Sequence, residues 1–284
     1  MRFRLPMFAV ALLVLEVVTT SQGQAPTFTS RRDVVRLDVL VSRAGKPVLG
    51  LKPQDFRIKD NGVVQEAEYL SFDEVPLNVI LTFDVSGSMA GDRLHDLREA
   101  GRAVIDQFRA GDRGALIAFS HAAAVRVDLT GDVASLTRAL DRTQADGQTS
   151  LIDATLAGLT LSGSEIGRSL VLVFSDGTDT SSFLEPAMVI DAARRVNAVV
   201  FAVTLGKRAP FLKDLADATG GDVVEVKASS DLRSTFVRIL NEYRQRYVVG
   251  YAPTGVASTG FHKIEVSVAS GGATVKTRPG YQAK

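Results

Sequence analysis

Hydrophobic and polar residues alternate near both ends of the chain. From Val35 to Val41 apolar side chains occupy every second position, which predicts a half-buried β-strand. Asp60-Asn61-Gly62 lies between two short apolar runs and predicts a tight hairpin. Near the C-terminus, residues 247–251 and 263–268 also have strand character, and a second hairpin is expected across Gly271-Gly272. Both ends of the chain are therefore expected to form β-structure.

The middle of the chain shows a different pattern, in which apolar runs of strand length alternate with apolar residues at helical spacing. Strands are expected at 77–83, 115–119, 125–129, 170–174 and 199–203. Helices are expected near 94–108, 133–140, 151–161, 188–194, 211–218 and 232–241. Alternation of this kind predicts a mostly parallel sheet with helices on both faces.

The two β segments are too short to bury both of their faces alone. We therefore expect the strands of residues 28–74 and 243–284 to pair into one small β-sandwich. The α/β segment, residues 76–242, is then inserted between them. The predicted fold class is α/β, with a doubly wound, mostly parallel sheet inserted in a β-sandwich.

Composition is that of an ordinary globular protein and excludes several kinds of function. Of the 284 residues, 45% are hydrophobic and 23% are charged, as in a folded domain with a core. The net charge of +1 gives no sign of a nucleic-acid partner. The lack of cysteine excludes disulfides, thiolate metal sites and cysteine nucleophiles.

Residues 1–23 have the order of a secretory signal peptide. Arg2 and Arg4 precede an apolar stretch, and small and polar residues follow up to Gly23. The apolar stretch is too short to cross a bilayer comfortably. We expect cleavage near Gly23, export to the periplasm or the cell exterior, and no integral span in the mature chain. A buried N-terminal helix and an uncleaved anchor remain open alternatives.

Three loops at the predicted carboxyl ends of strands carry oxygen ligands. The first is Asp84-Val85-Ser86-Gly87-Ser88, the second is Asp146-Gly147-Gln148-Thr149, and the third is Ser175-Asp176-Gly177. Doubly wound sheets bind their ligands at this edge. Carboxylate and hydroxyl oxygens suit Mg²⁺, Mn²⁺ or Ca²⁺ rather than zinc or copper. The sequence therefore predicts a site for a hard cation.

The D-x-S-x-S spacing resembles the metal-ion-dependent adhesion site of von Willebrand factor type A domains. In that family, a threonine on a later loop and an aspartate after the fourth strand complete the site. The matching positions in this sequence are Asp84, Ser86, Ser88, Thr149 and Asp176. The resemblance implies a bound Mg²⁺, with Mn²⁺ or Ca²⁺ as alternatives. It also implies a protein partner that offers an Asp or Glu to the metal, and no enzymatic activity.

The flanking β segments are similar to those of secreted bacterial proteins that contain type A-like domains. The N-terminal similarity lies in Leu51-Lys52-Pro53-Gln54-Asp55-Phe56 and the following Asp60-Asn61-Gly62. The C-terminal similarity lies in Tyr247-Val248-Val249-Gly250-Tyr251 and near Gly280-Tyr281. This second resemblance spans almost the whole mature chain and implies an architecture but no activity.

Other interpretations of the same residues remain open. Ser86 and Ser88 suit the N-terminal cap of the helix that follows them. Ser150 and Asp153 fit a capping box, which would leave the hydroxyl of Thr149 free to bind a metal ion.

Two other functions are compatible with the sequence. One is a structural scaffold with a vestigial metal site. The other is a Mg²⁺-dependent hydrolase, in which the metal serves phosphoryl transfer or Ser86 acts as a nucleophile beside one of three histidines, His95, His121 and His262. We also expect Arg31-Arg32 and Arg244-Gln245-Arg246 to face solvent. The favoured function is that of an exported, non-enzymatic, metal-dependent binding module.

Overall fold

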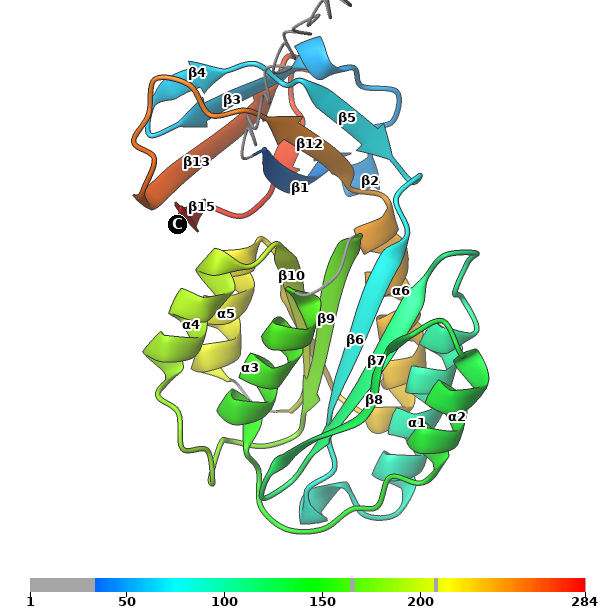
Figure 1. The fold of residues 1–284 in the computed structure, drawn as a ribbon. Helices are drawn as coiled ribbons and strands as arrows, with labels where there is room; N and C mark the ends of the chain where they lie inside the picture. Colours follow the sequence, from blue (N-terminus) through cyan, green and yellow to red (C-terminus); the bar gives the residue numbers. More distant parts are fainter. Residues whose placement is uncertain (1–33, 164–166, 207–208, 284) are drawn as a thin grey trace, which may run out of the picture. The chain divides into compact units, whose positions relative to one another are not determined.

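The computed structural model describes residues 34–163, 167–206 and 209–283. A β segment comes first, an α/β segment follows, and a second β segment ends the chain (Figure 1). The predicted signal peptide, residues 1–23, lies outside the described residues, as do Arg31 and Arg32. Within the three described ranges, no helix is both long enough and apolar enough to cross a membrane.

A mostly parallel sheet forms the centre of the α/β segment, with the strand order β11-β10-β9-β6-β7-β8. Each neighbouring pair is parallel except β7 and β8. The strands are β6 (Leu77–Asp84), β7 (Arg113–Phe119), β8 (Ala123–Thr130), β9 (Arg168–Ser175), β10 (Ala198–Leu205) and β11 (Val223–Val226). The neighbours β6 and β9 are buried along their whole length, as expected for strands that are covered on both faces.

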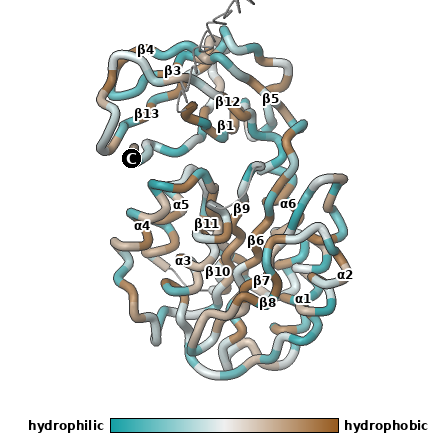
Figure 2. Tube along the Cα trace, in the orientation of Figure 1, coloured by the Kyte–Doolittle hydropathy of each residue, from teal (hydrophilic) through white to brown (hydrophobic). Residues whose placement is uncertain are grey.

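Helices cover both faces of this sheet (Figure 1). They are α1 (Asp92–Ile105), α2 (Val133–Asp141), α3 (Leu151–Ser162), α4 (Pro186–Arg195), α5 (Pro210–Thr219) and α6 (Leu232–Arg244). Leu97 of α1, Leu136 of α2 and Phe236 of α6 belong to one buried cluster. Residues of α3, α4 and α5 belong to a second cluster. Figure 2 shows the strands between these layers as the most hydrophobic part of the segment. The predicted doubly wound α/β fold is confirmed.

The N- and C-terminal strands form antiparallel sheets that share one core. One sheet has the order β14-β1-β12-β5, with β2 beside β1, and the other has the order β15-β13-β3-β4. The strands are β1 (Val35–Arg43), β2 (Lys46–Pro47), β3 (Phe56–Asp60), β4 (Val63–Gln65), β5 (Tyr69–Phe72), β12 (Tyr247–Tyr251), β13 (Gly260–Val268), β14 (Thr274–Lys276) and β15 (Gly280–Ala283). Their common core includes Leu37, Ile58 and Tyr247.

The α/β segment enters and leaves through neighbouring strands of one sheet. β5 leads into β6, and α6 leads into β12. β5 and β12 are paired, with Phe72 opposite Tyr247. Because the two connections lie side by side, the N- and C-terminal strands can pair around the inserted segment.

The hairpin expected across Gly271-Gly272 is wrong. The strand after these glycines, β14, pairs with β1, whereas β13 before them pairs with β3 and β15. The chain therefore crosses from one sheet to the other at this point. Two adjacent glycines indicate a turn but do not determine which strand pairs with the strand that follows. That choice depends on which pairing buries the apolar face of the strand.

The strand β11 was not predicted from the sequence. It follows Gly220-Gly221, and this pair is required by a close approach of two backbones. A Cβ atom added to Gly221 would lie 1.8 Å from the carbonyl oxygen of Val200. Only glycine allows the chain to pass here and add a short strand beside β10.

Arg244 and Arg246, which we expected to face solvent, are buried instead. The guanidinium of Arg246 packs over the rings of Phe201 and Tyr243. Arg244 Nη2 donates a hydrogen bond to Asp112 Oδ2 at 2.6 Å. Arg244 is the last residue of α6 and Arg246 directly precedes β12, and both side chains are covered where the helix joins the strand.

Candidate metal centre

The first ligand loop begins where a fully buried strand ends. The side chains of β6 are buried on both faces of the sheet, so the backbone is fixed as far as Asp84. A short 3₁₀ turn, η2 (Gly87–Met89), follows. Gly91, with φ of 76°, then turns the chain into α1, and this conformation favours glycine. Ser86 and Ser88 are thereby held on a short turn at the carboxyl edge of the sheet.

Hydrogen bonds join four of the five predicted ligands. The backbone N–H of Ser86 donates to Asp84 Oδ1 at 2.9 Å. The Oγ atoms of Ser86 and Ser88 lie 3.1 Å apart. Ser88 Oγ donates to Asp176 Oδ1 at 2.7 Å. Asp176 directly follows β9, the neighbour of β6, so parallel pairing of the two strands brings these distant residues together.

Thr149, the fifth predicted ligand, is buried on the loop before α3. A Cβ atom added to Gly177 would lie 3.7 Å from Thr149 Oγ1, so this hydroxyl lies beside the residue that follows Asp176. The N–H of Gly87 donates to the carbonyl of Gly147 at 3.0 Å and ties the first two loops together. The five predicted residues therefore meet at one edge of the sheet. That they bind a metal ion stays a prediction.

Neither serine of the first loop caps the following helix. α1 begins at Asp92, its N-cap is Gly91, and the cap makes no side-chain hydrogen bond. The hydroxyl groups of Ser86 and Ser88 instead contact each other and Asp176. Capping therefore does not account for this pair of serines.

The capping box expected for Ser150 and Asp153 is wrong. Ser150 makes no side-chain cap hydrogen bond. The carboxylate of Asp153 accepts from the backbone N–H groups of Phe183 and Leu184, each at 3.0 Å. A contact between distant loops thus takes the carboxylate that the local pattern assigned to the cap.

Two side chains at this edge were not identified as site residues from the sequence. Ser175, the last residue of β9, is buried, and its Oγ donates to Asp84 Oδ2 at 2.7 Å. Arg93, in the first turn of α1, places Nη1 3.0 Å from Asp176 Oδ2 and 3.3 Å from the carbonyl oxygen of Ser88. The triplet Ser-Asp-Gly could have drawn attention to Ser175, whereas Arg93 resembles any exposed helical arginine.

The environment of Asp84 favours a positively charged neighbour. Burial raises the pKa of Asp84 above its usual value. Hydrogen bonds from Ser86 and Ser175 lower the pKa in part, and the nearby carboxylate of Asp176 raises it. A buried carboxylate under these conditions is stabilised in its ionised form by a cation.

The donor set fits a hard divalent cation. It offers two carboxylates, from Asp84 and Asp176, and three hydroxyls, from Ser86, Ser88 and Thr149. Oxygen donors of this kind suit Mg²⁺, Mn²⁺ and Ca²⁺. Among the described residues there is no group of three or more His, Asp or Glu side chains placed to hold a metal ion. The proposed site is of another kind, because it has only two carboxylates and takes its other ligands from hydroxyl groups.

His121 and His262 have hydrogen-bonding partners other than Ser86. His121 lies near the second loop, but its Nδ1 contacts Ser120 Oγ at 3.3 Å. His262 is buried in the sandwich, where Nδ1 lies 2.7 Å from Asp60 Oδ1. The hydroxyl of Ser86 contacts Ser88 Oγ at 3.1 Å, so neither of these two histidines is placed as its base.

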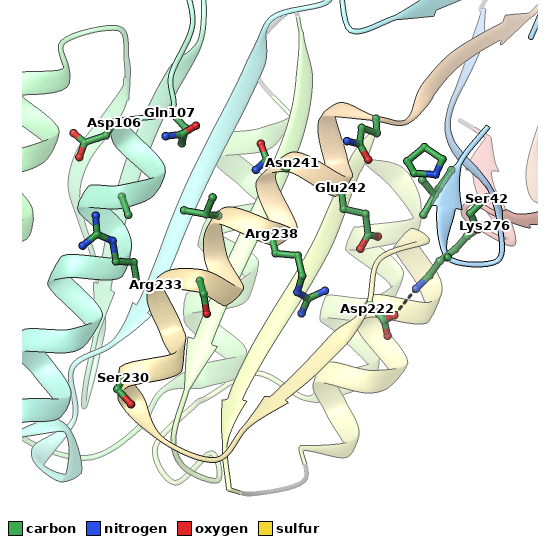
Figure 3. Close-up of a pocket in the computed structure, with 17 residues that line it drawn as sticks. Ser42, Asp106, Gln107, Asp222, Ser230, Arg233, Arg238, Asn241, Glu242 and Lys276 are labelled. Atoms are coloured by element: carbon green, nitrogen blue, oxygen red, sulfur yellow. Dashed lines mark hydrogen bonds and ion pairs between the residues drawn. The ribbon is translucent and has the colours of Figure 1, made fainter. Parts of the chain in front are cut away.

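A groove of about 1130 Å³ runs along α6 (Figure 3). Its charged lining has both signs, including Arg233, Arg238 and Glu242, and Lys276 forms an ion pair with Asp222 at 2.7 Å. None of the five predicted ligands lines it. This mixture of charges does not select a class of ligand.

Comparison with known proteins links the segment around the ligand loops to one family. Residues 79–178 match the von Willebrand factor type A domain. Inter-alpha-trypsin inhibitor heavy chain H2 from Mus musculus is 25% identical over 190 residues, which cover 61% of this chain and 20% of the mouse protein. The chain thus spans about a fifth of the length of this relative.

Two solved structures share the fold. A von Willebrand factor type A protein from Catenulispora acidiphila matches with a TM-score of 0.54 and 16% identity, over 82% of this chain and 76% of its own. Proximal thread matrix protein 1 from the mussel byssus, solved with a zinc-occupied MIDAS motif, matches with a TM-score of 0.53 and 16% identity. That match covers 65% of this chain and 49% of the mussel chain. The low identities limit both comparisons to the fold.

Proposed function

We propose that the segment matching the von Willebrand factor type A domain, residues 79–178, binds a protein partner through a divalent cation. The observation that carries the proposal is the hydrogen-bonded cluster of Asp84, Ser86, Ser88 and Asp176 beside Thr149. The family is commonly associated with protein interaction and adhesion. No catalytic step is part of the proposal.

The five residues would divide the work of holding the cation. Asp84 and Asp176 supply two negative charges, which balance one divalent ion. Ser86, Ser88 and Thr149 supply neutral hydroxyl ligands, and Thr149 engages directly only when a partner is bound. Mg²⁺ is the ion we propose, with Mn²⁺ or Ca²⁺ as alternatives, because all donors are oxygen atoms. The mussel protein with zinc in the same motif supports a divalent site in this fold.

A partner carboxylate would complete the shell of the cation. Mg²⁺ requires a near-octahedral set of ligands and keeps water wherever the protein offers none. Asp84 and Asp176 would balance the charge of the ion without filling all of its ligand positions. A further carboxylate could then replace a bound water without entering a strongly negative site. We therefore propose that an Asp or Glu on the surface of another protein is the ligand.

Export is the second part of the proposal. The basic, apolar and small residues of positions 1–23 support a cleaved signal peptide. A binding module exported in this way would meet its partner in the periplasm or outside the cell. Intact mass of the chain recovered from the periplasm or medium of a bacterial host would test this, and we expect an N-terminus near residue 24. Recovery of the uncleaved chain from the cytoplasm would contradict export.

Thermal melting of the purified protein in EDTA and in millimolar Mg²⁺ tests the metal site. A ligand that binds only the folded state, at one hundred times its Kd, adds about 2.7 kcal/mol to the free energy of unfolding. We expect Mg²⁺ to raise the melting temperature of the wild type by several degrees. We expect little or no rise for Asp84→Asn and a reduced rise for Ser88→Ala.

Asp146→Asn is the matched control, because Asp146 is exposed on the second loop and is not a proposed ligand. This variant should respond to Mg²⁺ as the wild type does. Equal melting of the wild type with EDTA, Mg²⁺, Mn²⁺ or Ca²⁺ would overturn the proposal and leave a scaffold that kept the fold without the ion.

A further inference from the structure

The guanidinium of Arg93 lies at the proposed metal site and places a positive charge there. The guanidinium donates to Asp176 Oδ2 at 3.0 Å, while Ser88 donates to Asp176 Oδ1 at 2.7 Å. Both oxygens of this carboxylate therefore have protein partners. The Asp176 side chain is 3% exposed, so the ion pair lies at the boundary between the buried site and solvent.

The guanidinium of Arg93 and a divalent cation would both be attracted to the carboxylate of Asp176. The carboxylates of Asp84 and Asp176 lie at one site, because Ser86 contacts Asp84 through its N–H and Ser88 through its hydroxyl, and Ser88 in turn donates to Asp176. Arg93 offsets one of these two charges. A divalent ion placed among Asp84, Ser86 and Asp176 would repel a guanidinium at the same carboxylate, because like charges at short range interact strongly near a protein surface.

The side chain of Arg93 is exposed enough to move away from Asp176. The Arg93 side chain is 50% exposed, although its partner is almost completely buried. Arg93 is the second residue of α1, which begins after the positive-φ residue Gly91. Rotation of the side chain into water would break the contacts with Asp176 and Ser88 without disturbing a buried core residue. A half-exposed ion pair of this kind contributes little net stability.

We propose that Arg93 competes with the divalent cation for Asp176, so that metal binding is linked to release of the Arg93 side chain. This inference rests on the proposed metal-dependent function and adds a form of regulation to it. Without cation, Arg93 balances the charge of Asp176 and keeps the loop after β9 attached to α1. With cation, the metal takes over that role. Arg93 thus lowers the apparent affinity for the metal.

Isothermal titration of Mg²⁺ and Mn²⁺ into wild type and Arg93→Gln tests the competition. Removing the competing charge should lower the Kd of the variant about fivefold relative to wild type, the size of effect expected for a half-exposed ion pair. Arg93→Lys keeps the charge and should stay close to wild type.

Arg102→Gln is the matched control, because Arg102 lies on the same helix and pairs with Asp141 instead of a proposed ligand. It removes the same net charge and should leave the metal Kd within twofold of wild type. Equal tightening in Arg102→Gln and Arg93→Gln would mean that net charge alone acts, and would overturn the competition.

A second measurement needs no substitution. Solvent exchange of the Arg93 guanidinium protons, followed by ¹⁵N NMR, should become faster when Mg²⁺ is added to the wild type. Unchanged exchange at saturating Mg²⁺, or a metal Kd in Arg93→Gln that is equal to or weaker than wild type, overturns the inference while the metal site stands. A wild type that binds neither ion removes the proposed function itself.

Discussion

At the scale of single residues, the site depends on how the two oxygens of Asp84 are held. Oδ1 accepts the backbone N–H of Ser86, and Oδ2 accepts the hydroxyl of Ser175 at 2.7 Å. The types of the proposed ligands could be predicted from the sequence, because D-x-S-x-S and the later Thr and Asp are recognisable residue by residue. The role of Ser175 could not, because a serine at a strand end carries no sign of its distant partner.

We predict that Ser175→Ala weakens metal binding without removing a proposed ligand. Loss of the hydroxyl frees Asp84 Oδ2 to change orientation, and groups that orient metal ligands typically affect metal affinity by about 10- to 100-fold. Titration of Mg²⁺ or Mn²⁺ should show a weakening of at least about tenfold. Ser162→Ala is the control, since Ser162 is also buried but donates to Leu159 within α3. An unchanged Kd in Ser175→Ala would show that Ser175 does not position Asp84.

At the scale of elements, the alternation of strands and helices could be read from the sequence because burial on two faces produces long apolar runs such as β9. The hydrogen bonds that join these elements could not be predicted from the apolar pattern. Asp112, before β7, accepts the backbone N–H of Leu77 at the start of β6 and a hydrogen bond from Arg244 at the end of α6. Arg244 looked solvent-exposed in the sequence because its partner lies 132 residues away.

This junction gives the fold a predictable dependence on pH. Burial alone would raise the pKa of Asp112, but hydrogen bonds from Arg244 and from the backbone N–H groups of Arg109 and Leu77 outweigh it, so the pKa is lowered. The unfolded value is close to 3.8. Since the folded value lies lower, the stabilisation is complete above about pH 4 and is lost as the pH falls further through the folded pKa.

We predict that Asp112→Asn lowers the free energy of unfolding at pH 7 by about 3 kcal/mol, because it leaves a buried arginine without its charge partner. The variant should also lose less stability than wild type between pH 4 and about pH 2. Urea unfolding at a series of pH values measures both effects. Asp73→Asn serves as control, since Asp73 pairs with Arg109 at the surface. Equal acid sensitivity in Asp112→Asn and wild type would contradict this assignment.

At the scale of the whole molecule, the inserted segment and the sandwich strands share buried charges. Arg168, at the start of β9, is 1% exposed, and its Nε donates to Asp38 Oδ1 of β1 at 2.8 Å. The alternating pattern of β1 predicted correctly that Leu37 and Val39 face the sandwich core. It gave no sign that Asp38, on the opposite face, is also buried, because alternation identifies the apolar side only.

We predict that Asp38→Ala destabilises the protein by about 3 to 5 kcal/mol in urea unfolding, because it leaves Arg168 buried and unpaired. The double variant Asp38→Leu with Arg168→Met should recover a large part of that loss, since neither charge remains. Asp141→Ala, which breaks the exposed pair with Arg102, should cost less than about 1 kcal/mol. Additive losses in the double variant would show that the two side chains are not coupled.

The most direct measurement is a crystal structure of the protein grown in Mn²⁺, with anomalous diffraction to locate the ion. We expect one strong anomalous peak among the side chains of Asp84, Ser86, Ser88, Thr149 and Asp176, with Arg93 moved away from Asp176. A peak at this position that is absent from crystals of Asp84→Asn would establish the metal-dependent site. Crystals at saturating Mn²⁺ with no peak among these side chains would contradict it, whatever other surface sites the ion occupied.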